Sequence, residues 1–292
     1  MKGTRPEATN PKLPVMQALM HSPLSHRCLG AALIILSLIW LSGGCGTLPD
    51  GRRWGGDVTP FPSVDRLKRA AKNAVLDPGT WVPAVGALAF QIDSWDRNLT
   101  HWASNNKPIF GTQQAADNAS YYLVDILLGT YVITGLATPS GDKPGEWAWN
   151  KIKAFSVGAG AWAVTSGVTE GLKGITQRER PDGSNNRSFP SSTSSQAAVY
   201  GSLACQNLDY LGIPKWADIS LRGGIATLIG GASWARLEGK YHYPSDVLVG
   251  AALGNLIGRF FNDAFIGPNN PNIWAQVEPS SRGAIVSLHW AH

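Results

Sequence analysis

Cations and hydroxyl groups stand at the ends of two apolar segments. Lys173 and Arg180 are separated by six residues, where Pro181 ends a helix-like stretch. Further along, the hydroxyl residues of 191–193 precede another apolar segment, and Ser191 is suited to cap a helix there. Cations and the free N–H groups of a helix N-terminus both bind anions. We therefore expect a site for a phosphate-like anion.

A third segment adds a histidine and a carboxylate, because Arg236, His242 and Asp246 follow one another at spacings of six and four residues. Each segment taken alone also has a structural explanation, since cations favour helix C-termini and serine or aspartate often begins a helix. Together, however, they supply three cations, a helix N-terminus and a His–carboxylate pair. This combination indicates phosphoryl transfer.

The order of these residues resembles the type-2 phosphatidic acid phosphatase superfamily, which includes bacterial acid phosphatases and vanadium haloperoxidases. The pattern of that family is Lys-x6-Arg-Pro, then Pro-Ser-Gly-His, then Ser-Arg-x5-His-x3-Asp. Residues 173–246 contain the three motifs in this order. The resemblance implies an all-α helical bundle of the acid phosphatase and haloperoxidase type.

The same resemblance implies the roles of the site residues. The phosphate oxygens would be held by Lys173, Arg180, Ser191, Ser192 and Arg236. His242 would attack phosphorus and form a phosphohistidine, and Asp246 would orient its imidazole. No metal or other cofactor is implied, and vanadate is expected to bind as a phosphate mimic.

Two positions depart from the family pattern. Ala235 replaces the serine before the third-motif arginine, and Thr193 stands where the family has the histidine that protonates the leaving group. An alternative alignment deletes that histidine and matches 193–195 to the residues that follow it, and both alignments lose the general acid. Glu179 and Asp182 lie near the first motif and could donate a proton only if their pKa values were raised. We expect hydrolysis of a phosphate ester or diphosphate, and a membrane tether favours a lipid substrate. The alternative is a weakened or inactive phosphate- or phospholipid-binding module of the same fold.

The elements that must position these residues are mainly helical. Segments with apolar residues at helical spacing, bounded by Pro, Gly, Asn or Asp, predict helices. They cover approximately 64–76, 80–96, 114–138, 147–172, 194–211, 217–236 and 245–265. Strand-like alternation occurs in 283–290, a possible C-terminal edge strand. The apolar runs contain Gly, Ser and Thr and fall short of the roughly 20 apolar residues of a membrane span, which favours a soluble bundle over a polytopic membrane protein.

The first 44 residues indicate export. A basic, polar start is followed by the apolar run 28–41 and then by small residues up to Cys45, as in a bacterial lipoprotein signal. We interpret 1–44 as the signal peptide, Cys45 as the lipidated residue, 45–63 as a tether and 64–292 as the phosphatase-like domain. An uncleaved anchor and ordinary cleavage are the alternatives. The expected location is the bacterial periplasm or cell envelope, on a membrane through the lipid anchor.

Charge gives no support to a nucleic-acid partner. The chain has a formal net charge of +5 and a pI near 9.2. Four basic residues and one acidic residue lie in 1–44, so the remainder carries 21 basic and 19 acidic side chains. It also has no run rich in Lys and Arg. The expected partners are therefore a phosphorylated small molecule or lipid and a membrane.

Overall fold

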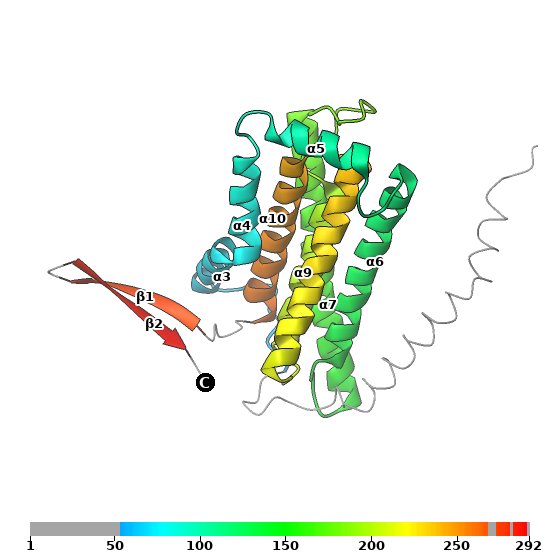
Figure 1. Cartoon of the computed structure of the whole chain (residues 1–292). Coiled ribbons are helices and arrows are strands. Elements are labelled where there is room, and N and C mark those ends of the chain that lie inside the picture. The colour runs from blue at the N-terminus through cyan, green and yellow to red at the C-terminus, as the bar shows by residue number, and fades with distance from the viewer. Residues whose placement is uncertain (1–52, 268–272, 281–282, 291–292) are drawn as a thin grey trace, which may run out of the picture. The chain divides into compact units, whose positions relative to one another are not determined.

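The structure is a computed structural model that describes residues 53–267, 273–280 and 283–290. The predicted signal peptide and Cys45 lie outside these ranges. Helices account for most of the described chain (Figure 1). They are α3 (Val64–Leu76), α4 (Pro78–Ala89), α5 (Trp95–Asn106), α6 (Gln113–Ala137), α7 (Pro144–Thr176), α8 (Ser192–Leu208), α9 (Lys215–Glu238), α10 (Pro244–Phe261) and the π-helical turn η1 (Asn262–Ile266). The prediction of an all-α bundle is confirmed.

Helix α8 forms the centre of the bundle and contacts α6, α7, α9 and α10. Most of its side chains are buried, and many of them are small. Gly254 of α10 crosses α8 so closely that a Cβ there would lie 2.8 Å from the Cβ of Ala198. The N-terminal ends of the two helices also meet, since the backbone N–H of Ser191 donates to the carbonyl of Asp246 at 3.0 Å.

Helix α5 is the main difference from the predicted elements. The sequence suggested one helix over 80–96, but α4 ends at Ala89 and α5 begins at Trp95. Few residues of α5 are apolar, so its periodicity is weak, although Asp96, Thr100 and Ala103 are buried. The helix contacts α9 and α10 and lies across one end of the bundle in Figure 1.

The C-terminal region forms a hairpin. Strands β1 (Ile273–Ser280) and β2 (Gly283–Trp290) pair in an antiparallel register in which the backbone of Val277 is the partner of Val286. The predicted strand over 283–290 is present, and its partner β1 had not been predicted. This two-stranded element leaves the classification of the chain unchanged.

The end of the predicted tether packs onto the bundle. Trp54 is fully buried, its backbone N–H donates to the carbonyl of Pro139 at 2.8 Å, and its ring meets Phe155 edge-on with the centroids 5.1 Å apart. The backbone N–H of Thr59 donates to the carbonyl of Phe265 at 3.1 Å. Residues 53–59 are thus part of the folded domain, although the sequence placed them in the tether.

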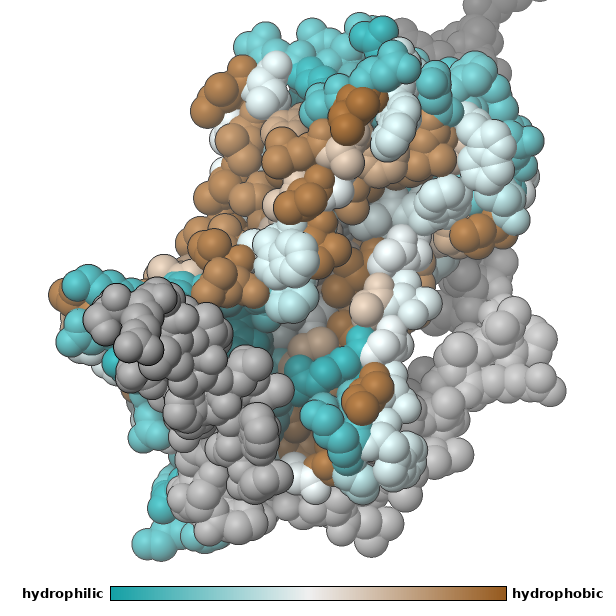
Figure 2. Space-filling view, turned by 60° about the vertical axis from the view of Figure 1, so that its left-hand side comes forward, coloured by the Kyte–Doolittle hydropathy of each residue, from teal (hydrophilic) through white to brown (hydrophobic). Residues whose placement is uncertain are grey.

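The bundle exposes many large apolar side chains. Figure 2 shows them gathered over one face, on the side that includes α4. That helix has no charged residue and leaves four large apolar side chains exposed: Trp81, Val82, Val85 and Leu88. A groove of about 830 Å³ between α4 and α10 is lined largely by apolar residues. Among the described residues, α6 alone is long and apolar enough to cross a membrane, and 28% of its most apolar window is buried.

Candidate active site

Four helix ends meet at the candidate site. Lys173 lies in the last turn of α7, Ser191 is the N-cap of α8, Arg236 lies in the last turn of α9, and Asp246 lies in the first turn of α10. His242 lies in the short connection between α9 and α10. The bundle therefore brings the three predicted motifs together, although they are far apart in the chain.

His242 is held in one protonation form by a backbone carbonyl. It is 2% exposed, and its Nδ1 lies 2.6 Å from the carbonyl oxygen of Ser188. A carbonyl only accepts hydrogen bonds, so Nδ1 carries the proton and Nε2 keeps its lone pair. Burial, together with Arg236 and Arg180, lowers the pKa of His242 to about 4, and Asp246 opposes this shift. The imidazole is therefore neutral at pH 7, as a nucleophile requires.

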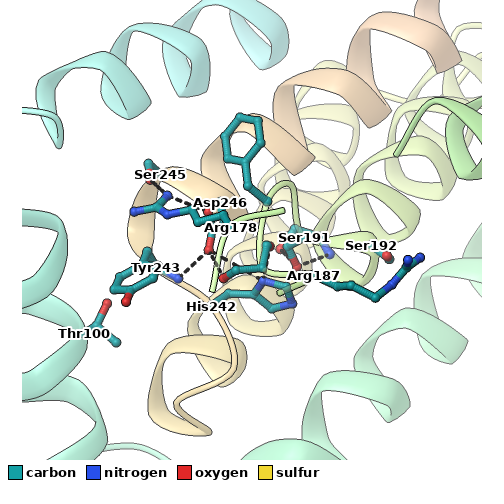
Figure 3. Close-up of polar contacts among 12 residues, drawn as sticks. Thr100, Arg178, Arg187, Ser191, Ser192, His242, Tyr243, Ser245 and Asp246 are labelled. Carbon is teal, nitrogen blue, oxygen red and sulfur yellow. Dashed lines mark hydrogen bonds and ion pairs between the residues drawn. The ribbon is translucent and has the colours of Figure 1, made fainter. Parts of the chain in front are cut away.

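Asp246 lies beside His242 but is held mainly by other donors. Its Oδ2 is 3.7 Å from Nδ1 of His242 and accepts hydrogen bonds from Ser188 Oγ at 2.5 Å and from the backbone N–H of Tyr243 at 2.8 Å. Burial would raise the pKa of this carboxyl, but its hydrogen bonds and Arg178 lower it below the usual value. Asp246 thus fixes the loop that presents His242 and keeps a negative charge behind the ring (Figure 3).

Arg178 is a site residue that the sequence interpretation missed. Its guanidinium donates to Asp246 Oδ1 at 2.7 Å and to Asp96 Oδ2 at 2.6 Å, and it covers the ring of Tyr243 at 4.2 Å from the centroid. Asp96 also accepts a hydrogen bond from the backbone N–H of Ser245 at 2.8 Å. Arg178 was visible within the first motif, whereas Asp96 comes from the unpredicted helix α5. The two residues connect α5 to the His–carboxylate pair.

Arg180 and Arg236 both have guanidinium nitrogens free for an anion. The Nε atoms of both are buried and have no hydrogen-bond partner among the described residues. Arg236 is 3% exposed, and its Nη1 donates to Asp117 Oδ1 at 2.7 Å and to Ser120 Oγ at 3.1 Å. Buried N–H groups without acceptors are costly. An anion at this position would satisfy them.

Lys173 and Ser192 contact each other at the more open side of the site. Lys173 is 5% exposed, and its Nζ donates to Ser192 Oγ. The hydroxyl of Ser192 in turn donates to Glu170 Oε1 at 3.1 Å, and Arg187 binds the other oxygen of the same carboxylate. Figure 3 draws Ser192 and Arg187 on the opposite side of His242 from Arg178. These four side chains form a connected polar cluster.

Ser191 and Asp182 have local hydrogen-bond partners. The buried Oγ of Ser191 accepts from the backbone N–H of Ser194 at 3.3 Å and thus caps α8. Thr193 lies in the first turn of α8 and is 8% exposed. Asp182 accepts from the backbone N–H of Ser184 in a turn at 2.9 Å. Phosphate binding by Ser191 and Ser192 remains a prediction.

The fold and the site define a class of protein: an all-α bundle with a neutral histidine, a neighbouring carboxylate and converging cations at one end. Residues 155–265 match the model of the PAP2 superfamily, the type-2 phosphatidic acid phosphatase superfamily that the three motifs resemble. The match covers α8, α9, α10 and most of α7. At the level of the family, this supports phosphatase-type phosphoester hydrolysis and phosphorylated small molecules or lipids as substrates. No curated protein and no solved structure matches the chain.

Proposed function

We propose that this protein hydrolyses a phosphate ester or diphosphate through a phosphohistidine at His242. The observation that carries the proposal is the state of this residue: a neutral, buried imidazole whose Nδ1–H is bound to a carbonyl, so that Nε2 keeps its lone pair. Arg180 and Arg236 lie close enough to influence its pKa. An anion held between these two cations would therefore lie near His242.

The chemistry follows from this arrangement. Nε2 of His242 attacks phosphorus, an N–P bond forms, and the bond from phosphorus to the leaving oxygen breaks. The ring gains positive charge, which the carboxylate of Asp246 at 3.7 Å stabilises. Arg180, Arg236 and Lys173 offset the charge of the phosphoryl oxygens. Water then attacks phosphorus, the N–P bond breaks, and inorganic phosphate leaves.

A lipid substrate is the finer part of the proposal. Its support is the exposed apolar surface that includes α4, together with the lipoprotein-like sequence that ends at Cys45. A periplasmic or cell-envelope protein anchored through Cys45 would meet such substrates at a membrane surface.

The second candidate function is a phosphate- or phospholipid-binding module. The observation in its favour is Thr193, which places no titratable group at the position of the family's general acid. Such a module would use the same cations and bind the same anions. It would not form a covalent intermediate.

The test combines anion binding and covalent trapping. Vanadate should raise the melting temperature of the wild-type protein by mass action, and Arg236→Ala should remove most of the shift. The matched control is Arg222→Ala, because Arg222 pairs with Asp209 and Asp218 away from the motifs. Absence of a vanadate shift at millimolar concentration in the wild type would exclude both candidate functions.

Covalent trapping separates the two functions. Acid-labile phosphate on the protein after quenching with a labelled phosphomonoester or diphosphate should be present in the wild type and in His101→Ala, and absent in His242→Ala. His101 is the control because it lies exposed on α5 and contacts Asn105. Vanadate binding without any trapped phosphate would favour the binding module.

A further inference from the structure

We propose that Ser192 and Lys173 form a proton relay that protonates the leaving group, a role that Thr193 cannot perform. The inference rests on the proposed hydrolysis at His242. It extends that proposal by assigning an acid to a site whose motif lacks one. Ser192 would be the group in contact with the leaving oxygen, and Lys173 would supply the proton behind it.

The need for an acid comes from the chemistry. An alkoxide leaving from a phosphomonoester is strongly basic, and a positioned acid typically accelerates its departure by about 10²–10⁴-fold. Thr193 follows Ser192, and among the described residues no titratable side chain donates a proton to its hydroxyl. His242 cannot serve, because it is the nucleophile and is neutral. An acid must therefore come from another group in contact with the cradle.

The geometry points to one hydroxyl–amine pair. Ser192 stands at the first helical position of α8, where the family pattern has a glycine with no side chain. Nζ of Lys173 donates to its Oγ, and this Oγ donates onward to Glu170 at 3.1 Å. Nζ also lies 3.4 Å from the same oxygen of Glu170, so the three groups form a triangle in which the hydroxyl accepts from the ammonium and donates outward.

The leaving oxygen would replace Glu170 as the acceptor of this chain. The Glu170 side chain is 49% exposed, whereas that of Lys173 is 6% exposed. The lysine is therefore buried behind the hydroxyl, and the carboxylate lies on the solvent side, where we place the leaving oxygen. Glu170 itself is a poor acid, because Lys173, Ser192 and Arg187 outweigh the effect of its burial and lower its pKa.

The charges around Lys173 also suit a proton donor. Burial lowers the pKa of its ammonium group below the ordinary value, Glu170 raises it, and Arg180 and Arg187 lower it further. The net shift is downward and makes Lys173 a stronger acid than an exposed lysine. An arginine at the same position would keep its proton.

The proton balance closes over one turnover. In the first step Nε2 of His242 binds phosphorus, the leaving oxygen takes the hydroxyl proton of Ser192, and Ser192 takes a proton from Nζ, which becomes a neutral amine. In the second step water attacks the phosphohistidine and gives its proton through Ser192 to Nζ. The ammonium and the hydroxyl are restored, and no further reactant is required.

The experiment compares two monoesters on the full-length protein: 4-nitrophenyl phosphate, whose leaving group needs little protonation, and butyl phosphate, whose leaving group needs it strongly. Ser192→Ala should lower kcat/KM for butyl phosphate about 10²–10⁴-fold more than for the aryl ester. Lys173→Arg keeps the positive charge and should show the same selective loss. Thr193→Val is the matched control and should show no selective loss.

Rescue provides a second readout. Thr193→His combined with Ser192→Gly restores the family motif and should recover butyl phosphate turnover relative to Ser192→Ala. An equal loss on both esters in Ser192→Ala would make Ser192 a phosphate ligand only and overturn the relay. A selective loss in Thr193→Val would assign the acid to Thr193 instead. If wild type forms no phosphohistidine with either ester, the proposed hydrolysis itself fails.

Discussion

His242 should make the stability of the protein depend on pH in a defined window. The pKa of this buried residue falls from 6.5 to about 4 on folding. Between these values the unfolded chain binds a proton that the folded chain excludes, so stability rises with pH across the window and is lost as the pH falls through it. The shift corresponds to about 3 kcal/mol, at roughly 1.4 kcal/mol for each pH unit.

The perturbation is His242→Asn, which keeps an amide donor near the carbonyl of Ser188 and removes the titration. Wild type should lose about 3 kcal/mol more than the variant when the pH falls from 7 to 4, equivalent to about 6–12 °C in melting temperature for a domain of this size. The contribution of Asp246 lies lower, because its pKa is below the usual value. The two groups are therefore separable.

The assay is denaturant unfolding at several pH values from 7 to 4, in buffers without phosphate, because phosphate is the proposed ligand of the site. His101→Asn is the matched control, since this exposed histidine should leave the pH slope of the wild type unchanged. Parallel stability curves for wild type and His242→Asn would refute the reasoning, because they would mean that His242 titrates alike in the folded and unfolded chain.

Three further predictions concern the site, the packing and the anchor. Arg178→Gln removes the partner of the buried carboxylate of Asp246 and should cost about 3 kcal/mol of unfolding free energy, measured in urea. The pH at which activity is lost on acidification should rise in the same variant. Gly254→Ala should destabilise the protein by about 1 kcal/mol or more through overpacking. In contrast, Gly224→Ala on the exposed side of α9 should stabilise the protein by about 0.5–1 kcal/mol. Cys45→Ala should abolish incorporation of labelled palmitate and leave a longer chain on a denaturing gel; equal labelling of the variant would contradict lipidation.

Helix periodicity and short motifs predicted much of the fold and of the site. Lys173, Arg236 and Asp246 could be placed because each lies within a turn of a helix end that Gly, Pro or a polar residue marks in the sequence. The link from Arg178 to Asp96 could not be predicted, since it joins residues 82 positions apart through a helix with little apolar periodicity. The bond from His242 to Ser188 is equally hidden, because its acceptor is a backbone carbonyl, which every residue carries.

The burial of Trp54 limits how far from the membrane the candidate site of a lipid-anchored domain could lie. Trp54 packs against Ala154 and Phe155 of α7, and its neighbour Gly55 lies against Asn150. Lys173 lies about 35 Å farther along this helix than Asn150 and about 27 Å farther than Phe155, at a rise of 1.5 Å per residue. The chain from Cys45 to Trp54 spans at most about 30 Å when fully extended. A lipid at Cys45 would therefore leave the candidate site of an upright bundle at the limit of the tether's reach from that membrane, whereas a bundle lying on its side would bring the site to the surface. The length of the tether would thus help to decide which membrane-bound substrates the site can meet.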